Sequence, residues 1–209
     1  MSFYLACEGI MDIQARKQAL RQRIIAAREN LAGGERLHLS REIADRICAL
    51  PAYRQARTVL GYLNFGAELA AEAWVQQALM DDKRVLLPRV NRASRQLDLY
   101  AVQDIERQVA PGSWGIREPR MEGCAPFEAL AELDFILLPG VAFSRDGGRL
   151  GYGGGFYDKL LQRMPHQPTL VAGAFALQVV AEVPQEDTDR RVDWLVTEHE
   201  TIRCKLERE

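Results

Sequence analysis

The chain has 209 residues, of which 47% are hydrophobic and 27% charged. These proportions are ordinary for a packed globular protein and exclude a wholly disordered, collagen-like or coiled-coil chain. The 27 lysines and arginines oppose 29 aspartates and glutamates, which leaves a net charge of -2 and no overall attraction for nucleic acid or an anionic membrane. No apolar run approaches the roughly 20 residues of a membrane span. We therefore expect a cytoplasmic protein with no nucleic-acid or membrane partner, in which any anion site is local.

The cysteines and histidines lack the spacing of a metal centre. The 4 cysteines form no CxxC pair, which excludes a zinc knuckle or a thioredoxin-like dithiol and suits a reducing compartment. The 3 histidines form no HExxH motif or close pair. If the chain binds a metal ion, carboxylates must hold it.

The apolar spacing predicts two N-terminal helices, over residues 12–31 and 35–50. Gly33-Gly34 separates them, and Pro51 ends the second because proline cannot continue the hydrogen-bonded backbone. After residue 57 the period changes to short apolar runs bounded by turn residues, which are typical of strands. The predicted strands span residues 58–63, 84–87, 97–102, 134–138, 170–175 and 194–197, and further helices span 69–80 and 156–163.

Strands that are apolar on both faces and separated by helices favour an α/β fold with a mostly parallel sheet covered on both sides. We expect the N-terminal helices to pack on this sheet. Residues 1–10 are expected to be a disordered leader, and residues 11–209 a single domain, because no repeat, low-complexity segment or linker divides them.

The segment 134–161 carries the strongest chemical signal: a buried strand, a turn, a glycine-rich loop and a helix. Four glycines between residues 151 and 155 let the loop backbone adopt positive φ and bring its N–H groups close to a ligand. A helix starting near Phe156 adds unpaired N–H donors and the positive end of its dipole. Together these features predict a phosphate cradle, with Arg149 at its entrance as a cation.

The same loop excludes two common nucleotide motifs. No Gly-Lys-Ser/Thr follows it, as a Walker A motif requires, and Phe156 stands where a Rossmann loop needs its third glycine. A plain reversing turn is the alternative to a phosphate cradle. Asp158, in the first turn of the predicted helix, either complements the helix dipole or serves as a magnesium ligand, and its position alone does not separate the two.

A row of basic residues borders the apolar stripe of the first helix. Lys17, Arg21 and Arg28 fall within ~40° of one another on a helical wheel. Arg16 and Arg23 lie on the opposite flank, so this geometry by itself favours a solvated basic rim over a row that points at phosphate.

Motifs spread along residues 12–198 resemble the 5-formyltetrahydrofolate cyclo-ligases, also called methenyltetrahydrofolate synthetases. The most specific is Pro-Gly-x-x-Phe…Gly-x-Arg-Leu-Gly-x-Gly-x-Gly-aromatic-Tyr-Asp, matched by residues 139–158. The others are Lys17 and Arg21 in a Lys-x-x-x-Arg pattern, Glu68 after an early strand, Leu87-Pro88-Arg89, Gly115-Ile116-Arg117-Glu118-Pro119, and Asp189 followed by Val192-Asp193.

This resemblance implies a three-layer α/β/α fold and a ligase of one-carbon metabolism. The implied reaction is the ATP- and Mg²⁺-dependent cyclisation of 5-formyltetrahydrofolate to 5,10-methenyltetrahydrofolate, with release of ADP and phosphate, by a chain acting as a monomer. The implied ATP-binding residues are Lys17, Arg21, Arg149, Leu150, Gly151, Tyr152, Gly153, Gly154, Gly155, Phe156 and Tyr157. The implied folate-binding residues are Leu63, Glu68, Trp114, Tyr152, Gly153, Gly154, Gly155 and Phe156; Asp158 and Asp189 are the implied magnesium ligands, and Lys17, Arg149 and Asp158 the implied catalytic residues.

Several of these residues have ordinary structural alternatives. Glu68 is also consistent with an exposed glutamate at a helix start, and Trp114 with a core tryptophan at the edge of the sheet. Asp189 lies in an acidic stretch that is equally typical of a surface turn. Tyr152 and Tyr157 either stack on a ligand or pack inward.

Three positions depart from the family pattern: Ala70-Ala71 replaces an acidic-Thr pair, Ser144 replaces an aspartate, and Phe156 replaces a tyrosine. The first raises an alternative function, a folate-binding or regulatory paralogue without turnover. A third hypothesis is a sugar-phosphate isomerase or acyl-transferring enzyme of similar architecture, because a fold does not specify one function.

Overall fold

The computed structural model of the chain describes residues 12–186 and 189–204, apart from the side chain of Trp114. The expected leader, residues 1–10, lies outside the described residues. Within these residues, no helix is both long enough and apolar enough to cross a bilayer.

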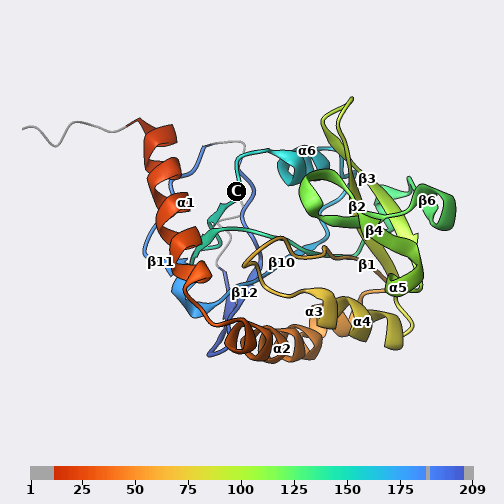
Figure 1. Cartoon of the computed structure of the whole chain (residues 1–209), viewed down its shortest axis with the longest axis horizontal. Coiled ribbons are helices and arrows are strands. Elements are labelled where there is room, and N and C mark those ends of the chain that lie inside the picture. The colour runs from red at the N-terminus through yellow and green to blue at the C-terminus, as the bar shows by residue number, and fades with distance from the viewer. Residues whose placement is uncertain (1–11, 187–188, 205–209) are drawn as a thin grey trace, which may run out of the picture.

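The centre of the fold is an eight-stranded sheet in the order β13-β12-β10-β7-β1-β2-β3-β6 (Figure 1). The four strand pairs from β12 to β2 are parallel, and the three remaining pairs are antiparallel. This confirms the mostly parallel sheet of an α/β fold. Its strands are β1 (Thr58–Leu60), β2 (Arg84–Asn91), β3 (Gln96–Val102), β6 (Ala125–Phe127), β7 (Phe135–Leu137), β10 (Thr169–Gly173), β12 (Trp194–Val196) and β13 (Thr201–Arg203).

Two smaller sheets accompany the central one. A three-stranded sheet has the order β11-β8-β9, and a two-stranded sheet pairs β4 with β5. Their strands are β4 (Val109–Pro111), β5 (Arg117–Pro119), β8 (Ala142–Ser144), β9 (Arg149–Leu150) and β11 (Val179–Val180). The helices are α1 (Ile13–Glu29), α2 (Gly33–Ala49), α3 (Pro51–Gln55), α4 (Glu72–Met80), α5 (Ile105–Gln108) and α6 (Phe156–Gln162), with 3₁₀ turns η1 (Ser113–Gly115), η2 (Met121–Gly123), η3 (Leu130–Glu132) and η4 (Ala176–Gln178).

The central strands bury both of their faces, because successive side chains on a strand point to opposite sides. On β1, Val59 belongs to the core under α2, α3 and α4, whereas Leu60 belongs to the core under α6. On β7, Phe135 and Ile136 divide in the same way. Burial on both faces explains why these strands read as continuous apolar runs rather than alternating ones.

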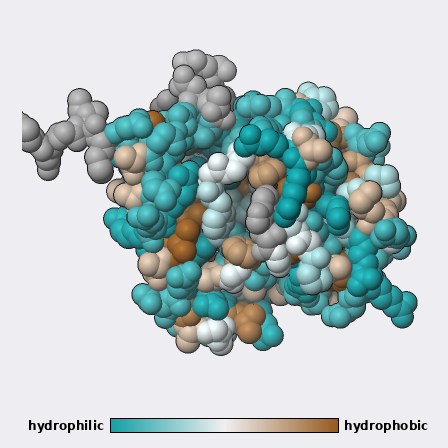
Figure 2. All heavy atoms as spheres, turned by 45° about the horizontal axis from the view of Figure 1, so that its top comes forward, coloured by the Kyte–Doolittle hydropathy of each residue, from teal (hydrophilic) through white to brown (hydrophobic). Residues whose placement is uncertain are grey.

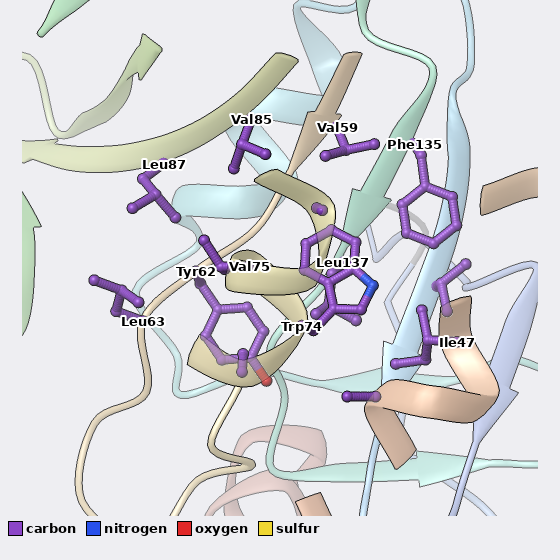
Figure 3. Close-up of a cluster of buried hydrophobic side chains, with 14 of the residues drawn as sticks. Ile47, Val59, Tyr62, Leu63, Trp74, Val75, Val85, Leu87, Phe135 and Leu137 are labelled. Atoms are coloured by element: carbon purple, nitrogen blue, oxygen red, sulfur yellow. The ribbon is translucent and has the colours of Figure 1, made fainter. Parts of the chain in front are cut away.

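Aliphatic side chains and several aromatic rings fill the core between the sheet and α2, α3 and α4, and Figure 3 shows part of this cluster, including Trp74 and Phe135. Trp74 of α4 stacks on Phe135 with ring centroids 5.8 Å apart and an interplanar angle of 22°, and Tyr53 of α3 contacts both rings at the same centroid distance. Trp74 and Phe135 are fully buried. Side chains of this size contribute most of the apolar area in such a layer.

The first helix differs from the expectation that both N-terminal helices pack on the large sheet. Helix α2 does contact β10 and β12, but α1 makes its main contacts with β8 and η4. Ile24 of α1 packs with Val141, Ala142 and Leu150 in a separate small core. One face of α1 is therefore occupied by the small sheet. On its other flank, Arg21 contacts Gly151, just after β9, and Lys17 contacts Glu186 and Asp189, which follow β11.

Several predicted boundaries were wrong. Gly33-Gly34 opens α2 instead of separating two helices, and α1 already ends at Glu29. Pro51 follows the end of α2, as predicted, but also begins the short helix α3, since proline is well tolerated in the first turn of a helix. The first strand ends at Leu60, so the segment 61–68 leaves the sheet and becomes available to a site.

Candidate active site

A cleft of about 1020 Å³ opens beside the carboxyl ends of β1 and β7. The chain runs from β1 to β2 on one side and later places β7 on the other side of β1, so the strand order reverses there. Ligands of open α/β sheets typically bind at such a reversal point. The cleft is lined by residues from α1 (14, 17, 18, 21), the loop after β1 (62, 63, 65, 68), the β2–β3 pair (87, 88, 90, 97), β5 and its preceding residue (116–118), and the segments 139, 149–159, 162, 186 and 189.

Hydrophilic residues cover most of the face shown in Figure 2, and a few apolar ones reach the surface between them. Two aromatic residues that line the cleft are among the exposed large hydrophobic residues: Phe65 is 47% exposed and Tyr152 is 44% exposed. Exposed aromatic side chains inside a cleft offer flat apolar surface to a planar ligand.

The glycine-rich loop adopts the backbone that the sequence predicts. Gly153 has a φ of +100° and Gly155 a φ of +67°, and Gly155 is the residue that caps the start of α6. A Cβ on Gly154 would lie 2.8 Å from a ring carbon of Phe156. The loop thus depends on glycine both for its dihedral angles and for the close approach of Phe156.

Helix α1 holds this loop by two arginines. Arg21 donates from Nε to the carbonyl oxygen of Gly151 at 2.8 Å, and Arg28 donates from Nη2 to the hydroxyl oxygen of Tyr152 at 2.5 Å. Lys17 and Arg28 are buried and Arg21 is half-buried, whereas Arg16 and Arg23 on the opposite flank are exposed. The basic row of α1 is therefore an inward-facing feature and not a solvated rim.

Arg149 and Asp158 form an ion pair inside the cleft. Arg149 is 6% exposed and donates from Nη2 to Oδ1 of Asp158 at 2.6 Å, and its Nη1 lies 3.3 Å from the carbonyl oxygen of Pro139. Its Nε has no hydrogen-bond partner among the described residues. Asp158 stands in the first turn of α6, as predicted.

Lys17 is bound by two carboxylates. Its Nζ donates to Oε2 of Glu186 and to Oδ2 of Asp189, both at 2.7 Å, and Asp189 also accepts the backbone N–H of Glu186 at 2.9 Å. Burial alone would lower the pKa of Lys17, but the hydrogen bonds and charges of Asp189 and Glu186 outweigh it and raise this pKa above its ordinary value. Lys17 is therefore a fixed positive charge in the cleft.

Glu68 is a buried carboxylate at the other end of the cleft. It is 8% exposed, and its Oε2 accepts the backbone N–H of Phe65 at 2.7 Å. Burial raises the pKa of Glu68, while the Phe65 N–H, the Tyr152 hydroxyl and the positive charge of Arg28 act in the opposite direction. The neighbouring phenols of Tyr62, Tyr152 and Tyr157 all have raised pKa values, chiefly through burial, so they are neutral hydrogen-bonding groups at physiological pH.

The described residues contain no group of three or more His, Cys, Asp or Glu side chains arranged to hold a metal ion. Asp158 and Asp189 both line the cleft, but each is paired with a cation. Mg²⁺ is commonly bound by only one or two carboxylates together with substrate phosphates and water. The residues present therefore fit a magnesium ion that arrives with a nucleotide, and do not by themselves build a closed metal cage.

The arrangement of a glycine loop, buried cations and a separate buried carboxylate agrees with the comparison to known proteins. The family model described as "5-formyltetrahydrofolate cyclo-ligase family" matches residues 13–198. The chain belongs to this family. As a member of the cyclo-ligase family, the chain is a ligase, and the resemblance inferred from its motifs is confirmed.

Two curated relatives match this cyclo-ligase over most of their length. The 5-formyltetrahydrofolate cyclo-ligase of Mus musculus is 30% identical over 196 residues, covering 90% of this chain and 96% of the relative. The enzyme of the same name from Haemophilus influenzae is 31% identical over 182 residues, covering 86% and 95%. The NMR structure of the 5,10-methenyltetrahydrofolate synthetase of Aquifex aeolicus superposes with a TM-score of 0.79 at 33% identity, covering 92% of this chain and 95% of that one.

In this cyclo-ligase the cleft brings together the predicted site residues whose side chains the structure describes. They are Lys17 and Arg21 of α1, Leu63, Glu68, Asp189 and residues 149–158 of the phosphate loop and the start of α6. The backbone at Trp114 forms the 3₁₀ turn η1, but its side chain lies outside the described part of the structure. The proximity of these residues is an observation, whereas their roles as ligands of ATP, folate and magnesium remain predictions.

Other residues of the cleft, among them Tyr62, Phe65 and Glu186, were not predicted from the sequence, and Glu118 was named only as part of a family motif. Glu186 precedes Asp189 in the acidic stretch, and that proximity is the signal that could have identified it. Glu118 is 3% exposed and accepts hydrogen bonds from the backbone N–H groups of Val90 and Ser113. It therefore connects two segments beside the cleft. Only the tertiary structure shows that these side chains line the same cleft.

Two of the three departures from the family pattern, Ala70-Ala71 and Ser144, are not among the described residues that line the cleft, whereas the third, Phe156, does line it. Ala71 is 1% exposed and packs in the core under α4, and Ala70 donates its backbone N–H to Oγ of Ser40 at 3.0 Å. Neither alanine is among the described residues that line the cleft. At the second departure, Ser144 donates to Oδ1 of Asp146, so the nearby aspartate takes part in the same turn.

Proposed function

We propose that this chain catalyses the ATP- and Mg²⁺-dependent cyclisation of 5-formyltetrahydrofolate to 5,10-methenyltetrahydrofolate, with release of ADP and phosphate. The observation that carries the proposal is the content of one cleft, where a glycine loop flanked by Lys17, Arg21 and Arg149 opens onto the same hollow as Glu68 and Phe65. A cyclo-ligase must bring a nucleotide and a folate together, and this cleft has room and suitable groups for both.

The reaction needs activation of the formyl oxygen, which is otherwise a poor leaving group. ATP transfers its γ-phosphoryl group to that oxygen, and the O–P bond forms as the bond to ADP breaks. N10 then attacks the formyl carbon and closes the five-membered ring. Phosphate departs with the former formyl oxygen, and N10 loses its proton, which leaves the methenyl cation.

The nucleotide half of the cleft supports this phosphoryl transfer by position and charge. The N–H groups of the loop 151–155 surround the phosphates, because no side chain but that of Tyr152 intervenes. Lys17, Arg21 and Arg149 neutralise charge that spreads over the phosphoryl oxygens. Because Lys17 and Arg149 are buried, they hold this charge without the reorganisation that a solvated side chain would require.

The folate half of the cleft presents a carboxylate and apolar surface. Glu68 is proposed to accept hydrogen bonds from the amines of the pterin ring, with Leu63 and Tyr152 beside it. Trp114 is proposed to supply a further flat face, by resemblance to the family. Asp158 and Asp189 would hold the Mg²⁺, which offsets negative charge on the phosphate oxygens when it is bound.

The test is a turnover assay that follows methenyl absorbance and ADP release with 5-formyltetrahydrofolate and Mg²⁺, with and without ATP. We expect product only when ATP and Mg²⁺ are both present, with one ADP released for each methenyl group formed. Tight folate binding without ADP release would support the paralogue instead, and stabilisation by sugar phosphates or thioesters but not by folates would support the isomerase or acyl-transfer hypothesis.

We further propose that the enzyme acts as a cytoplasmic monomer and that residues 11–209 form one domain. The proposed ligand residues with described side chains line a cleft of a single chain, so these contacts need no second subunit. Cys48, Cys124 and Cys204 are free thiols, in keeping with a reducing compartment. Sedimentation at micromolar concentration tests the monomer.

A further inference from the structure

One buried cation of the fold, Arg28, touches the active-site residues without lining the cleft. It lies in the last turn of α1 and is 2% exposed. Its Nη2 donates to the hydroxyl oxygen of Tyr152 at 2.5 Å, and its Nη1 lies 3.4 Å from the carbonyl oxygen of Gly140. Among the described residues, Arg28 is not part of the cleft wall, so its effect on a ligand must pass through its neighbours.

The burial of the Arg28 guanidinium costs desolvation free energy. Arginine is almost never fully buried unless its charge is compensated. The Nε of Arg28 is buried and has no hydrogen-bond partner among the described residues. The same helix keeps Arg16 and Arg23 exposed, so α1 does not force its arginines inward. An apolar side chain would fill the position of Arg28 at a lower cost in desolvation.

The first neighbour of Arg28, Tyr152, lies between two glycines of the phosphate loop. Gly151 precedes it and is held by Arg21 through its carbonyl oxygen, and Gly153 follows with a φ of +100°, a conformation that glycine adopts readily. Tyr152 is 44% exposed and lines the cleft, while its hydroxyl is held by Arg28. The bond from Arg28 therefore fixes a side chain that faces the ligands.

The charge of Arg28 also acts on Glu68, the buried carboxylate of the folate half, whose Oε2 accepts the backbone N–H of Phe65. Its titration depends on the groups that face it: the cation Arg28 and the phenols of Tyr62, Tyr152 and Tyr157. The phenols are neutral at physiological pH, and the positive charge of Arg28 opposes the effect of burial on the Glu68 carboxylate. Without that charge, Glu68 would bind a proton more readily.

We propose that Arg28 is a positioning residue for both substrates: a single guanidinium anchors Tyr152 of the phosphate loop and places its positive charge near Glu68. The nucleotide and folate halves of the cleft then share one anchor in α1. This inference rests on the proposed function for its substrates, but the anchor itself is a property of the ligand-free protein.

The kinetic test compares Arg28→Met, Arg28→Lys and Tyr152→Phe with the wild type, and uses Arg23→Met as a matched control on the exposed flank of α1. We expect Arg28→Met to raise KM for both substrates about tenfold and to move the acid limb of kcat/KM to higher pH. Arg28→Lys should restore the acid limb, because it keeps the charge, but not KM for ATP. Arg23→Met should match the wild type.

A double variant tests whether Arg28 acts through Tyr152. If it does, Arg28→Met combined with Tyr152→Phe should raise KM for ATP no further than Arg28→Met alone, because the two changes remove the same contact. Fully additive effects would overturn the shared anchor. So would a folded Arg28→Met enzyme with wild-type KM values and pH profile, or one that loses activity only in proportion to its loss of thermal stability.

A ligand-free measurement separates this inference from the proposed function. The titration of the Glu68 side-chain carboxyl by ¹³C NMR is expected to shift to higher pH in Arg28→Met, and an unmoved titration would overturn the role of Arg28. A wild-type protein without turnover would refute the proposed function and leave this result standing. If Arg28→Met does not fold, the role of Arg28 is tested with Arg28→Lys and Tyr152→Phe. Their KM values and Glu68 titrations are then compared with those of the wild type.

Discussion

Arg149 and Asp158 form an ion pair in the cleft, with Nη2 of the arginine 2.6 Å from Oδ1 of the aspartate. The proposed phosphate-binding cation and the proposed metal ligand are thus paired with each other. Lys17 and Asp189 repeat this relationship at 2.7 Å. An ATP–Mg²⁺ complex offers each member of these pairs a partner of opposite charge, so its binding exchanges protein ion pairs for protein–ligand ones.

Replacement of Asp158 tests the metal ligand directly. Asp158→Ala is expected to lower kcat by more than about 100-fold, because it removes a ligand of the ion that offsets phosphate charge. The fold should persist, since the carboxylate lies in a cleft and not in the core. Steady-state kinetics across a range of Mg²⁺ concentrations measure kcat, and circular dichroism shows whether the variant is folded.

The control for this variant is Asp45→Ala on the exposed surface of α2, which should leave kcat unchanged. Wild-type turnover in Asp158→Ala would mean that the carboxylate serves only the ion pair with Arg149 and the dipole of α6.

Replacement of Lys17 tests the buried cation. Lys17→Met leaves Glu186 and Asp189 facing each other without their shared partner, and it should lower the free energy of unfolding by about 1 kcal/mol and weaken ATP binding more than about tenfold. Arg16→Met is the matched control: its exposed pair with Glu182 should contribute little. Urea unfolding measures the free energy of unfolding, and titration calorimetry measures the affinity for ATP. Equal ATP affinity in the Lys17→Met and Arg16→Met variants would contradict the proposed role of Lys17 in ATP binding.

Replacement of Gly154 tests the phosphate loop. A Cβ at this position would lie 2.8 Å from the Phe156 ring, so Gly154→Val should push that ring aside and weaken ATP binding about tenfold, or ~1.4 kcal/mol. Gly34→Val is the control, since nothing lies within 4 Å of a Cβ there. The measurement is the dissociation constant for ATP by calorimetry, and an unchanged value in Gly154→Val would remove the basis for the cradle.

Replacement of Glu68 links pH, stability and function. Because burial raises its pKa, the folded protein binds more protons than the unfolded chain between the ordinary glutamate value of about 4.3 and the raised one. Stability must therefore fall as pH rises through that window. Glu68→Gln removes the ionisation, so the variant should be more stable than the wild type above the window, and it should bind folate more weakly.

Urea unfolding at several pH values between about 4 and 8 shows whether the free energy of unfolding falls as the pH rises. Glu106→Gln, on the exposed surface of α5, is the control. A Glu68→Gln variant that is less stable than the wild type at neutral pH would show that the ionised carboxylate stabilises the fold.

The glycine loop and α6 could be predicted from the sequence because local rules govern them. Four glycines between a buried strand and an apolar helical pattern leave few alternatives for the backbone. The central strands were predictable for a related reason: residues such as Val59 and Leu60 are both buried, so the run shows no polar break. The shortest strands, such as β9 and β11 with two residues each, carry no periodic signal.

The sequence by itself determined the family, the phosphate-loop motif and the alternation of strands and helices, because each is written in neighbouring residues. Only the tertiary structure decided that Lys17 meets Asp189, that Arg28 reaches Tyr152, and that Glu68 shares their cleft. These contacts join residues more than 100 positions apart or lie across separate elements. Their distances follow from how the layers pack, and helical spacing alone could not distinguish a buried cation from a solvated one.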